Sequence, residues 1–245
     1  MGTVPTERDI VEHALTLMRS EPRIGPHFRP RELSIDSDGM VTIEAEVESI
    51  AQKRLALERI ARIRGVSGII DRLHVRPAVQ MSDAGIIDHL RKAFAGELSF
   101  RGECISERRG ESLTLIQDSP EGTIGDIDFE VADGIVTLNG SVPSLTAKRL
   151  AGVVAWYVPG VRDIVNGIVV EPDEDDGPTR IEEGVHLALE KDPLVDASQV
   201  RVGVRERTVH LSGLVRSDDI KRAAESDAWY VFGVDDVVND IAVGA

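Results

Sequence analysis

The chain repeats itself three times, and this repetition constrains its fold more than any other feature. Residues 134–170 align with residues 207–243 without gaps, and 19 of the 37 positions are identical. Residues 39–75 align with residues 134–170 in the same way, with 13 of 37 positions identical. Self-similarity at such an interval indicates an array of like structural units. Three diverged copies of one small module favour a binding or scaffolding array over a single active site.

The acidic balance of the chain excludes one large class of partners. The 245 residues carry a formal net charge of −15, which divides into 0 over residues 7–78, −6 over residues 79–172 and −9 over residues 173–245. Nucleic-acid affinity depends on cationic side chains that neutralise phosphates. We therefore expect no general nucleic-acid binding. If any module meets an anionic surface, it should be the first.

Few features of the sequence bear on the cellular compartment of the protein. Cys104 is the only cysteine, so no disulfide can form within the chain. The first ten residues, MGTVPTERDI, lack a basic stretch followed by an apolar run, and we see no secretory signal in them. No apolar run approaches the roughly 18 residues that a transmembrane helix needs. We expect a cytoplasmic protein.

The third copy predicts the fold of all three. Apolar residues recur at helical spacing over residues 181–191, alternate with polar ones over residues 200–204 and 208–215, and return to helical spacing over residues 218–231. A last strand follows over residues 237–243. A right-handed crossover through the second helix would place this strand parallel to the one before it. We predict an α+β chain of three tandem αββαβ modules, each a three-stranded mixed sheet covered by two helices.

The same alignment gives the expected module boundaries. The first module should cover residues 6–78, the second residues 82–172 and the third residues 179–245. The second contains an insert at about residues 97–125, which is expected to form a small hairpin that turns after Arg109. The carboxylates of the linker EPDEDDGP, before the third module, should repel one another and resist collapse. We therefore expect the third module to move.

The best preserved positions of the second and third modules form one pattern, which resembles the BON domain. In the second module it comprises VTLNGSV at 136–142, then Lys148-Arg149, Ala155-Trp156, Gly160-Val161 and Val165-Asn166. In the third module it recurs at 209–215, Lys221-Arg222, Ala228-Trp229, Gly233-Val234 and Val238-Asn239. The first module keeps less of it, with Ala45 for the glycine, Ala61 for the tryptophan and Asp71 for the asparagine. The family is named for bacterial osmotically inducible and nodulation proteins.

The resemblance implies properties that the pattern alone does not give. It implies an αββαβ fold, no enzymatic activity and no cofactor. It also implies association with phospholipid or with the cell envelope, often under osmotic stress. Some related cytoplasmic proteins combine such a module with other domains and sense small ions.

Several repeated residues are expected to be structural. Gly65, Gly160 and Gly233 follow the second helix of their copies, where a C-terminal turn requires positive φ. Asn166 and Asn239 open the last strand and should make turn hydrogen bonds.

The histidines do not predict a metal site. His13 and His89 are equivalent in the repeat, but the apolar phase places Gly184, not His186, at the corresponding position of the third module. No zinc-type spacing of Cys and His exists. Phosphate-binding loops and nucleophile elbows are absent as well. We expect no metal and no catalytic residue.

Four aromatic residues are candidates for a binding site. At about 100° per residue, Trp156 and Trp229 point nearly opposite the apolar stripes of their helices. Tyr157 and Tyr230 lie at the edges of those stripes. Such side chains either pack on a neighbouring module or the module's own chain, or contact a ligand, a partner or a membrane.

A basic helix is the other candidate. The segment KRLALERIARIR, residues 53–64, surrounds an apolar face with Arg54, Arg59, Arg62 and Arg64. Basic amphipathic helices can lie on anionic lipid. The apolar face is needed for the module's own sheet, so only the charges could dock an anionic surface.

These features support three hypotheses about function. The leading one is a non-enzymatic binding protein that docks envelope phospholipid or an envelope-associated partner in an osmotic-type stress response. The alternative is a structural or assembly protein whose modules bind protein partners or form a homo-oligomer. The third is a sensor of a small ligand or ion.

Overall fold

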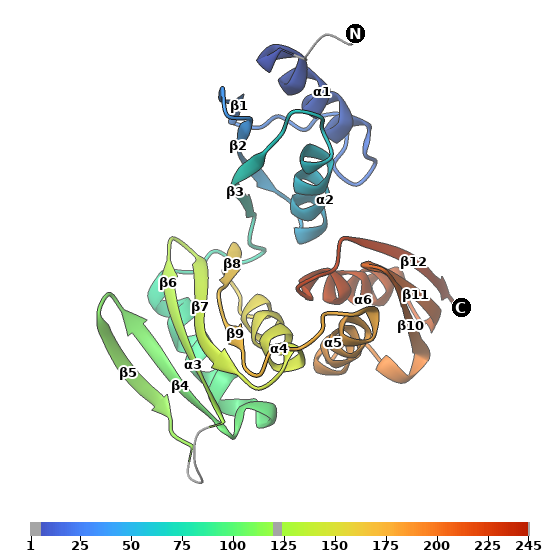
Figure 1. Cartoon of the computed structure of the whole chain (residues 1–245). Coiled ribbons are helices and arrows are strands. Elements are labelled where there is room, and N and C mark those ends of the chain that lie inside the picture. The colour runs from blue at the N-terminus through green and yellow to red at the C-terminus, as the bar shows by residue number, and fades with distance from the viewer. Residues whose placement is uncertain (1–5, 120–123, 245) are drawn as a thin grey trace. The chain divides into compact units, whose positions relative to one another are not determined.

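The chain forms two compact units, the first ending at Arg76 and the second beginning at Pro77 (Figure 1). The computed structural model describes residues 6–119 and 124–244. Over these residues the first unit holds one sheet and the second unit holds two. The α+β prediction is confirmed, since every sheet is mixed and lies against helices.

The first unit has the predicted order of helix, strand, strand, helix, strand. Its elements are α1 (Glu7–Ser20), β1 (Glu32–Ile35), β2 (Met40–Val47), α2 (Ile50–Ala61) and β3 (Gly68–Val75). β1 is antiparallel and β3 parallel to β2. Alternate residues of β2 are buried, which leaves the other face of the sheet polar.

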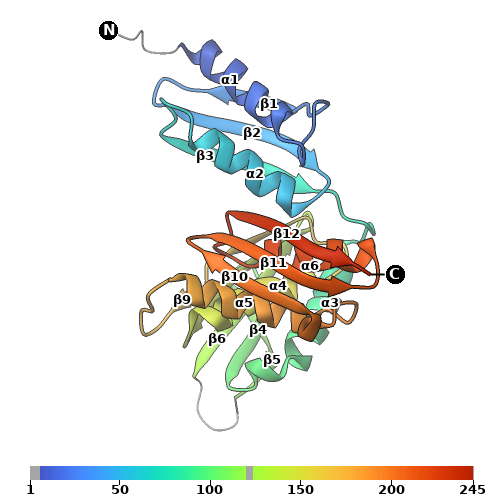
Figure 2. The ribbon, with the colours of Figure 1, turned by 90° about the vertical axis from the view of Figure 1, so that its right-hand side faces the viewer.

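The third module repeats this order within the second unit. Its elements are α5 (Pro178–Lys191), a 3₁₀ turn (Ala197–Gln199), β10 (Val200–Arg205), β11 (Thr208–Val215), α6 (Asp218–Tyr230) and β12 (Asp236–Val243). β12 is parallel to β11, as the crossover predicts. Seen from the sheet side in Figure 2, the three strands lie in front of α5 and α6.

The second module departs from the three-stranded prediction. Its elements are α3 (Asp83–Gly96), a 3₁₀ turn (Leu98–Phe100), β4 (Glu103–Arg109), β5 (Ser112–Gln117), β6 (Gly125–Ala132), β7 (Ile135–Val142), α4 (Leu145–Trp156), β8 (Asp163–Asn166) and β9 (Val169–Val170). The insert forms the predicted hairpin, and β4 then pairs in parallel with β6. The last strand is interrupted into β8 and β9, which both pair with β7. The result is a six-stranded sheet.

The repeated residues hold equivalent turns. Gly65, Gly160 and Gly233 adopt φ of 99°, 90° and 97°, which confirms the predicted left-handed turn after each second helix. The Nδ2 groups of Asn166 and Asn239 donate to carbonyls of the preceding helix, 2.9 Å and 3.0 Å away. Each asparagine Oδ1 accepts from the amide two residues later at 3.3 Å. The structural role is as predicted, but the position is not: Asn166 ends β8 and Asn239 lies within β12, so neither residue opens the last strand.

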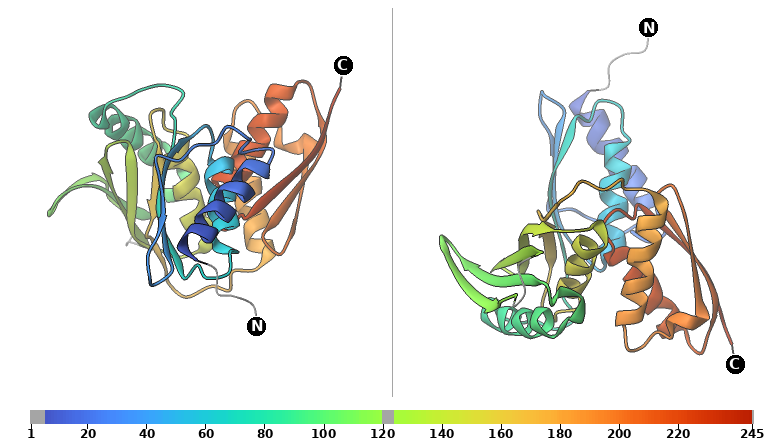
Figure 3. Two further views of the ribbon diagram at one scale, coloured as in Figure 1. Left: turned by 90° about the horizontal axis from the view of Figure 1, so that it is seen from above. Right: turned by 60° about the horizontal axis from the view of Figure 1, so that its bottom comes forward.

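The second unit arranges its elements as sheet, helices, helices, sheet. Figures 1 and 3 show α4 beside α5 and α6, between the sheets of the second and third modules. On the outer side of α4, Phe94 stacks with Phe100 and Phe129, with ring centroids 5.8 Å and 5.7 Å apart. The helical layer between the two sheets is where the second and third modules meet.

Candidate functional site

Three aromatic side chains join the second and third modules. Trp156, at the end of α4, stacks on Tyr230 of α6 with ring centroids 5.6 Å apart and planes 13° from parallel. Tyr157 meets the same ring edge-on, with centroids 5.8 Å apart. Trp156 also packs against the apolar core of the second module. Such pairs stabilise beyond the area that they bury, so they fix α4 on α6.

This packing decides between the roles considered for the aromatic residues. Trp156, Tyr157 and Tyr230 pack on a neighbouring module. Trp229 is 1% exposed. The alternative in which its indole forms a recognition surface is wrong, because the buried side chain has no accessible face.

Arg149 reaches from the second module into the third. Its side chain is fully buried. Nε donates to the Phe232 carbonyl at 2.8 Å, and Nη2 pairs with the Asp176 carboxylate. Gly184 of α5 makes room for it, since a Cβ at that position would lie 2.8 Å from Arg149 Cδ. The equivalent residue of the third module, Arg222, has a side chain that is 70% exposed.

The acidic linker is held in place rather than free. Glu174 accepts a hydrogen bond from the Leu145 amide at 2.8 Å, at the first turn of α4. Its carboxylate also lies 3.6 Å from the Arg180 guanidinium. Asp176 is paired with Arg149. The expectation that this linker lets the third module move is wrong, because cations and a helix N-terminal amide bind two of its five carboxylates.

Asp227 is a buried carboxyl at the same interface. The Tyr157 hydroxyl lies 2.8 Å from Asp227 Oδ1 and 2.9 Å from the Ala188 carbonyl, and its one proton can serve only one of them. The pKa of Asp227 is raised to about 7, mainly by burial and also by the Asp192 carboxylate, against the lowering effect of the bond from Tyr157. A protonated Asp227 can donate to Tyr157, so that both acceptors are satisfied.

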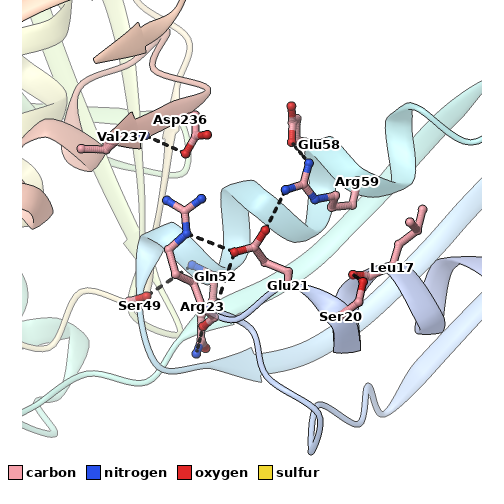
Figure 4. A network of polar contacts seen from close by, with 10 residues as sticks. All are labelled: Leu17, Ser20, Glu21, Arg23, Ser49, Gln52, Glu58, Arg59, Asp236 and Val237. Carbon is pink, nitrogen blue, oxygen red and sulfur yellow. Dashed lines mark hydrogen bonds and ion pairs between the residues drawn. The ribbon is translucent and has the colours of Figure 1, made fainter. Parts of the chain in front are cut away.

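The arginine residues predicted to meet lipid are partly engaged within the first unit. Figure 4 shows the Glu21 carboxylate between Arg59 and Arg23, which donate to it at 2.7 Å and 3.2 Å. Although burial opposes it, these bonds hold the pKa of Glu21 below its usual value. Arg59 thereby joins α2 to the end of α1, and Glu21 compensates much of the charge that was predicted to meet lipid.

The other arginine residues of this helix differ in exposure. Arg54 is half-buried, whereas Arg62 and Arg64 are exposed. Arg62 pairs with Glu58 one turn earlier, which neutralises part of its charge. Two exposed guanidinium groups therefore remain of the four that were predicted.

A groove of about 590 Å³ opens on the third module where β11 ends. It is lined by Leu194, Leu214, Val215, Ile220, Asp196, Gln199, Arg216 and Gly244. Leu194 and Leu214 are 67% and 56% exposed. The volume lies within the range of ordinary ligand sites. The groove thus offers exposed apolar side chains beside an acid and an arginine.

Sequence reasoning missed this groove, although one signal was present. Leu214 falls out of phase with Leu211 and Val215, which are buried. An apolar residue on the polar face of a half-buried strand is the kind of departure that indicates a contact. Leu194 lies in the turn after α5, where no periodicity applies.

The described part of the chain contains neither a metal-binding cluster nor a membrane-spanning helix. Within residues 6–119 and 124–244, no three His, Cys, Asp or Glu side chains are grouped so that they could hold a metal ion. Among the same residues, no helix combines the length and apolar character that crossing a bilayer requires.

Comparison with known proteins agrees with the repeat pattern. The family model for the BON domain matches residues 110–172 and 178–245. Over 143 residues the chain is 26% identical to "Osmotically-inducible protein Y" of Escherichia coli (strain K12), a match that covers 58% of this chain and 63% of that protein. The chain therefore spans less than two thirds of that relative. The first module lies outside the matched ranges and is placed in the array by its order of elements.

Two solved structures were also matched. Both are of CdsD, described as a structural protein of the Type III secretion system of Chlamydia trachomatis. One shares 12% identity over 98% of this chain and 100% of its own, with a TM-score of 0.25. The other shares 13% identity over 96% of this chain and 92% of its own, also with a TM-score of 0.25.

Replacing Arg149 tests the junction of the modules. Arg149→Ala should lower the free energy of unfolding of the second unit by about 2–4 kcal/mol, because it empties buried space and leaves the Phe232 carbonyl and Asp176 without this donor. Arg222→Ala removes the equivalent but exposed residue and should change it by no more than about 0.5 kcal/mol. Urea denaturation followed by tryptophan fluorescence reports on this unit alone, since both tryptophans lie in it. Equal effects of the two changes would contradict the assignment.

The pKa of Asp227 predicts a pH dependence. Because its folded pKa, about 7, lies above its unfolded value, the unfolded chain releases this proton first as pH rises. The stability contributed by Asp227 is therefore full below about pH 4 and falls steadily until about pH 7. Asp227→Asn should be more stable than the wild type at pH 8, and this difference should shrink towards pH 5. Asp219→Asn, an exposed change on the same helix, is the control and should show no such trend.

Proposed function

The chain belongs to the BON domain family, and from this premise we propose that it is a non-enzymatic docking protein of an osmotic-type stress response. Its relation to a protein named as osmotically inducible supports the stress context. We propose an envelope-associated protein as its partner. The cytoplasmic location and the role as a sensor of a small ligand or ion stay predictions from the sequence.

The groove of the third module is the observation that carries this proposal. Leu194 and Leu214 are exposed leucines that a partner could cover. Covering such apolar side chains with a partner removes them from water, which favours association. Because α4, α5 and the linker hold the third module against the second, the groove is presented on a rigid body, which lowers the ordering cost of binding.

Charge favours a protein segment over an anionic lipid at this groove. The linker and the third module together, residues 173–245, carry a net charge of −9. Asp196 lines the groove, and Asp218 and Asp219 follow closely after Arg216. An anionic headgroup would be repelled, whereas an apolar segment with flanking Lys or Arg would be attracted. The partner should therefore present apolar side chains next to basic ones.

Lipid docking through the first module is a second candidate. It is favoured by the exposed guanidinium groups of Arg62 and Arg64 and by the neutral charge of residues 7–78. Each basic side chain near an anionic surface contributes about 1 kcal/mol, so two of them support only weak binding.

Site-specific crosslinking tests the groove. A photoreactive phenylalanine analogue at position 214 should form an adduct with one defined protein in living cells, and more of it after the osmolarity of the medium is raised. The same analogue at position 210, an exposed site on the same strand, should give none. Leu194→Ser should reduce the adduct at position 214, because it removes an apolar anchor. Adducts of equal yield at both positions, or none at position 214, would refute the groove as the docking site.

Vesicle sedimentation tests the second candidate. Vesicles of phosphatidylglycerol should pull down the wild type at low salt, whereas phosphatidylcholine vesicles should not. Arg62→Gln with Arg64→Gln should lose this binding, since about 2 kcal/mol of attraction is removed. Arg205→Gln, an exposed change on the third module, should keep it. If the wild type stays in the supernatant with both lipids, the lipid candidate is excluded and the groove proposal is unaffected.

A further inference from the structure

Strand β5 is an open edge of the six-stranded sheet. It pairs with β4 on one side, and the described residues provide no strand on its other side. Figures 1 and 3 both show it at the outer border of the second module. Leu113 and Leu115 are 54% and 57% exposed. They pair with Arg108 and Ser106 of β4, on the face of the sheet opposite to buried Ile105.

The composition of β5 sets it apart from the other edges. Native proteins protect edge strands with charges, prolines or bulges. The other edge strands of more than two residues each carry charge within the described sheets, at Glu32 in β1, Asp71 and Arg72 in β3, Asp163 in β8, Arg201 and Arg205 in β10, and Asp236 and Asp240 in β12. β5, with the sequence SLTLIQ, has neither charge nor proline. Its one bulge lies beyond Leu115, so residues 112–115 form a regular edge.

The hairpin fixes which backbone groups of β5 are free. Arg109 and Ser112 flank a two-residue turn and therefore form a hydrogen-bonded pair. Hydrogen-bonded and non-hydrogen-bonded pairs alternate along an antiparallel ladder. The N–H and C=O groups of Thr114 thus point towards β4, and those of Leu113 and Leu115 point outward. Two residues with exposed side chains also offer the unpaired backbone groups.

We propose that a second copy of this chain pairs with β5 through its own β5, in an antiparallel arrangement with Thr114 on the two-fold axis. In this register Leu113 of each copy lies opposite Leu115 of the other. Each such pair exchanges two backbone hydrogen bonds, which satisfies the groups that point outward. The two sheets become one, and four leucines lie side by side on its open face. This interface goes beyond the proposed function and does not use the groove.

Charge at the ends of β5 supports a second copy as the occupant. Glu111 precedes β5 and Asp118 follows it. Antiparallel pairing about Thr114 places Asp118 of one copy opposite uncharged Gly110 of the other. Glu111 lies opposite uncharged Gln117. A parallel pairing would instead place Asp118 next to Asp118, and like charges in adjacent positions are unfavourable.

The contact is small, so the dimer should be weak and dependent on concentration. A strand of six residues buries less area than a standard stable interface. Sedimentation velocity over a wide range of protein concentration should show a monomer that becomes a dimer. Leu113→Lys should remain monomeric throughout, with an unchanged circular dichroism spectrum and melting curve. A wild type that is monomeric at every concentration, or a Leu113→Lys variant that dimerises equally well, would overturn the proposal.

Disulfide trapping tests the register. In a Cys104→Ser background, Thr114→Cys places one thiol from each copy at the axis, in a non-hydrogen-bonded pair whose Cα atoms are about 4.5 Å apart. This distance suits a disulfide. Ser112→Cys is the matched control, because position 112 faces position 116 of the second copy. Mild oxidation should link the Thr114→Cys protein and leave the Ser112→Cys protein monomeric. Equal linking of both, or of neither, would overturn the register.

Discussion

The ion pair between Arg149 and Asp176 is the interaction on which the second unit depends. It is made by a side chain that leaves its own module, passes Gly184 and ends at the Phe232 carbonyl after α6 and the Asp176 carboxylate of the linker. Because the guanidinium is buried, its charge has to be compensated where it lies. The position of the linker and the packing of α5 follow from that requirement. The aromatic stack of Trp156 on Tyr230 adds a second contact between the second and third modules.

Residues at equivalent positions of the repeat make different contacts because their surroundings differ. Lys53 and Lys221 each donate to a carbonyl of the following strand at 2.7 Å. Lys148 occupies the same position, yet its ammonium lies 5.2 Å from the centroid of the Phe232 ring in the third module. A cation above an aromatic face is a favourable contact. The second module has therefore turned two repeated cations, Lys148 and Arg149, into contacts between modules.

The sequence alone predicts the local structure of each module well and the relations between modules poorly. Hairpins, helix ends and turns depend on residues close together in the chain, and Gly160, Gly233 and the turn after Arg109 illustrate this. The surroundings of Trp229 depend on tertiary packing. The helical phase shows only that its side chain points away from the apolar stripe of its own helix. The prediction that the linker is mobile was wrong for a similar reason. The sequence shows that its acids repel one another, but the cations and the amide that bind two of them come from residues 145, 149 and 180, outside this stretch of acids. The groove was missed because Leu194 and Leu214 are brought together by the fold.

Gly184 has a consequence for how such arrays change during evolution. A glycine within a helix costs about 1 kcal/mol relative to alanine, and here it leaves the space that Arg149 fills. An arginine at 149 without a glycine at 184 would clash, and the glycine without the arginine would leave a void. The arginine and the glycine thus complement each other across the boundary between modules. The second and third modules are therefore no longer interchangeable repeats, because either one placed beside a different neighbour would lose this contact.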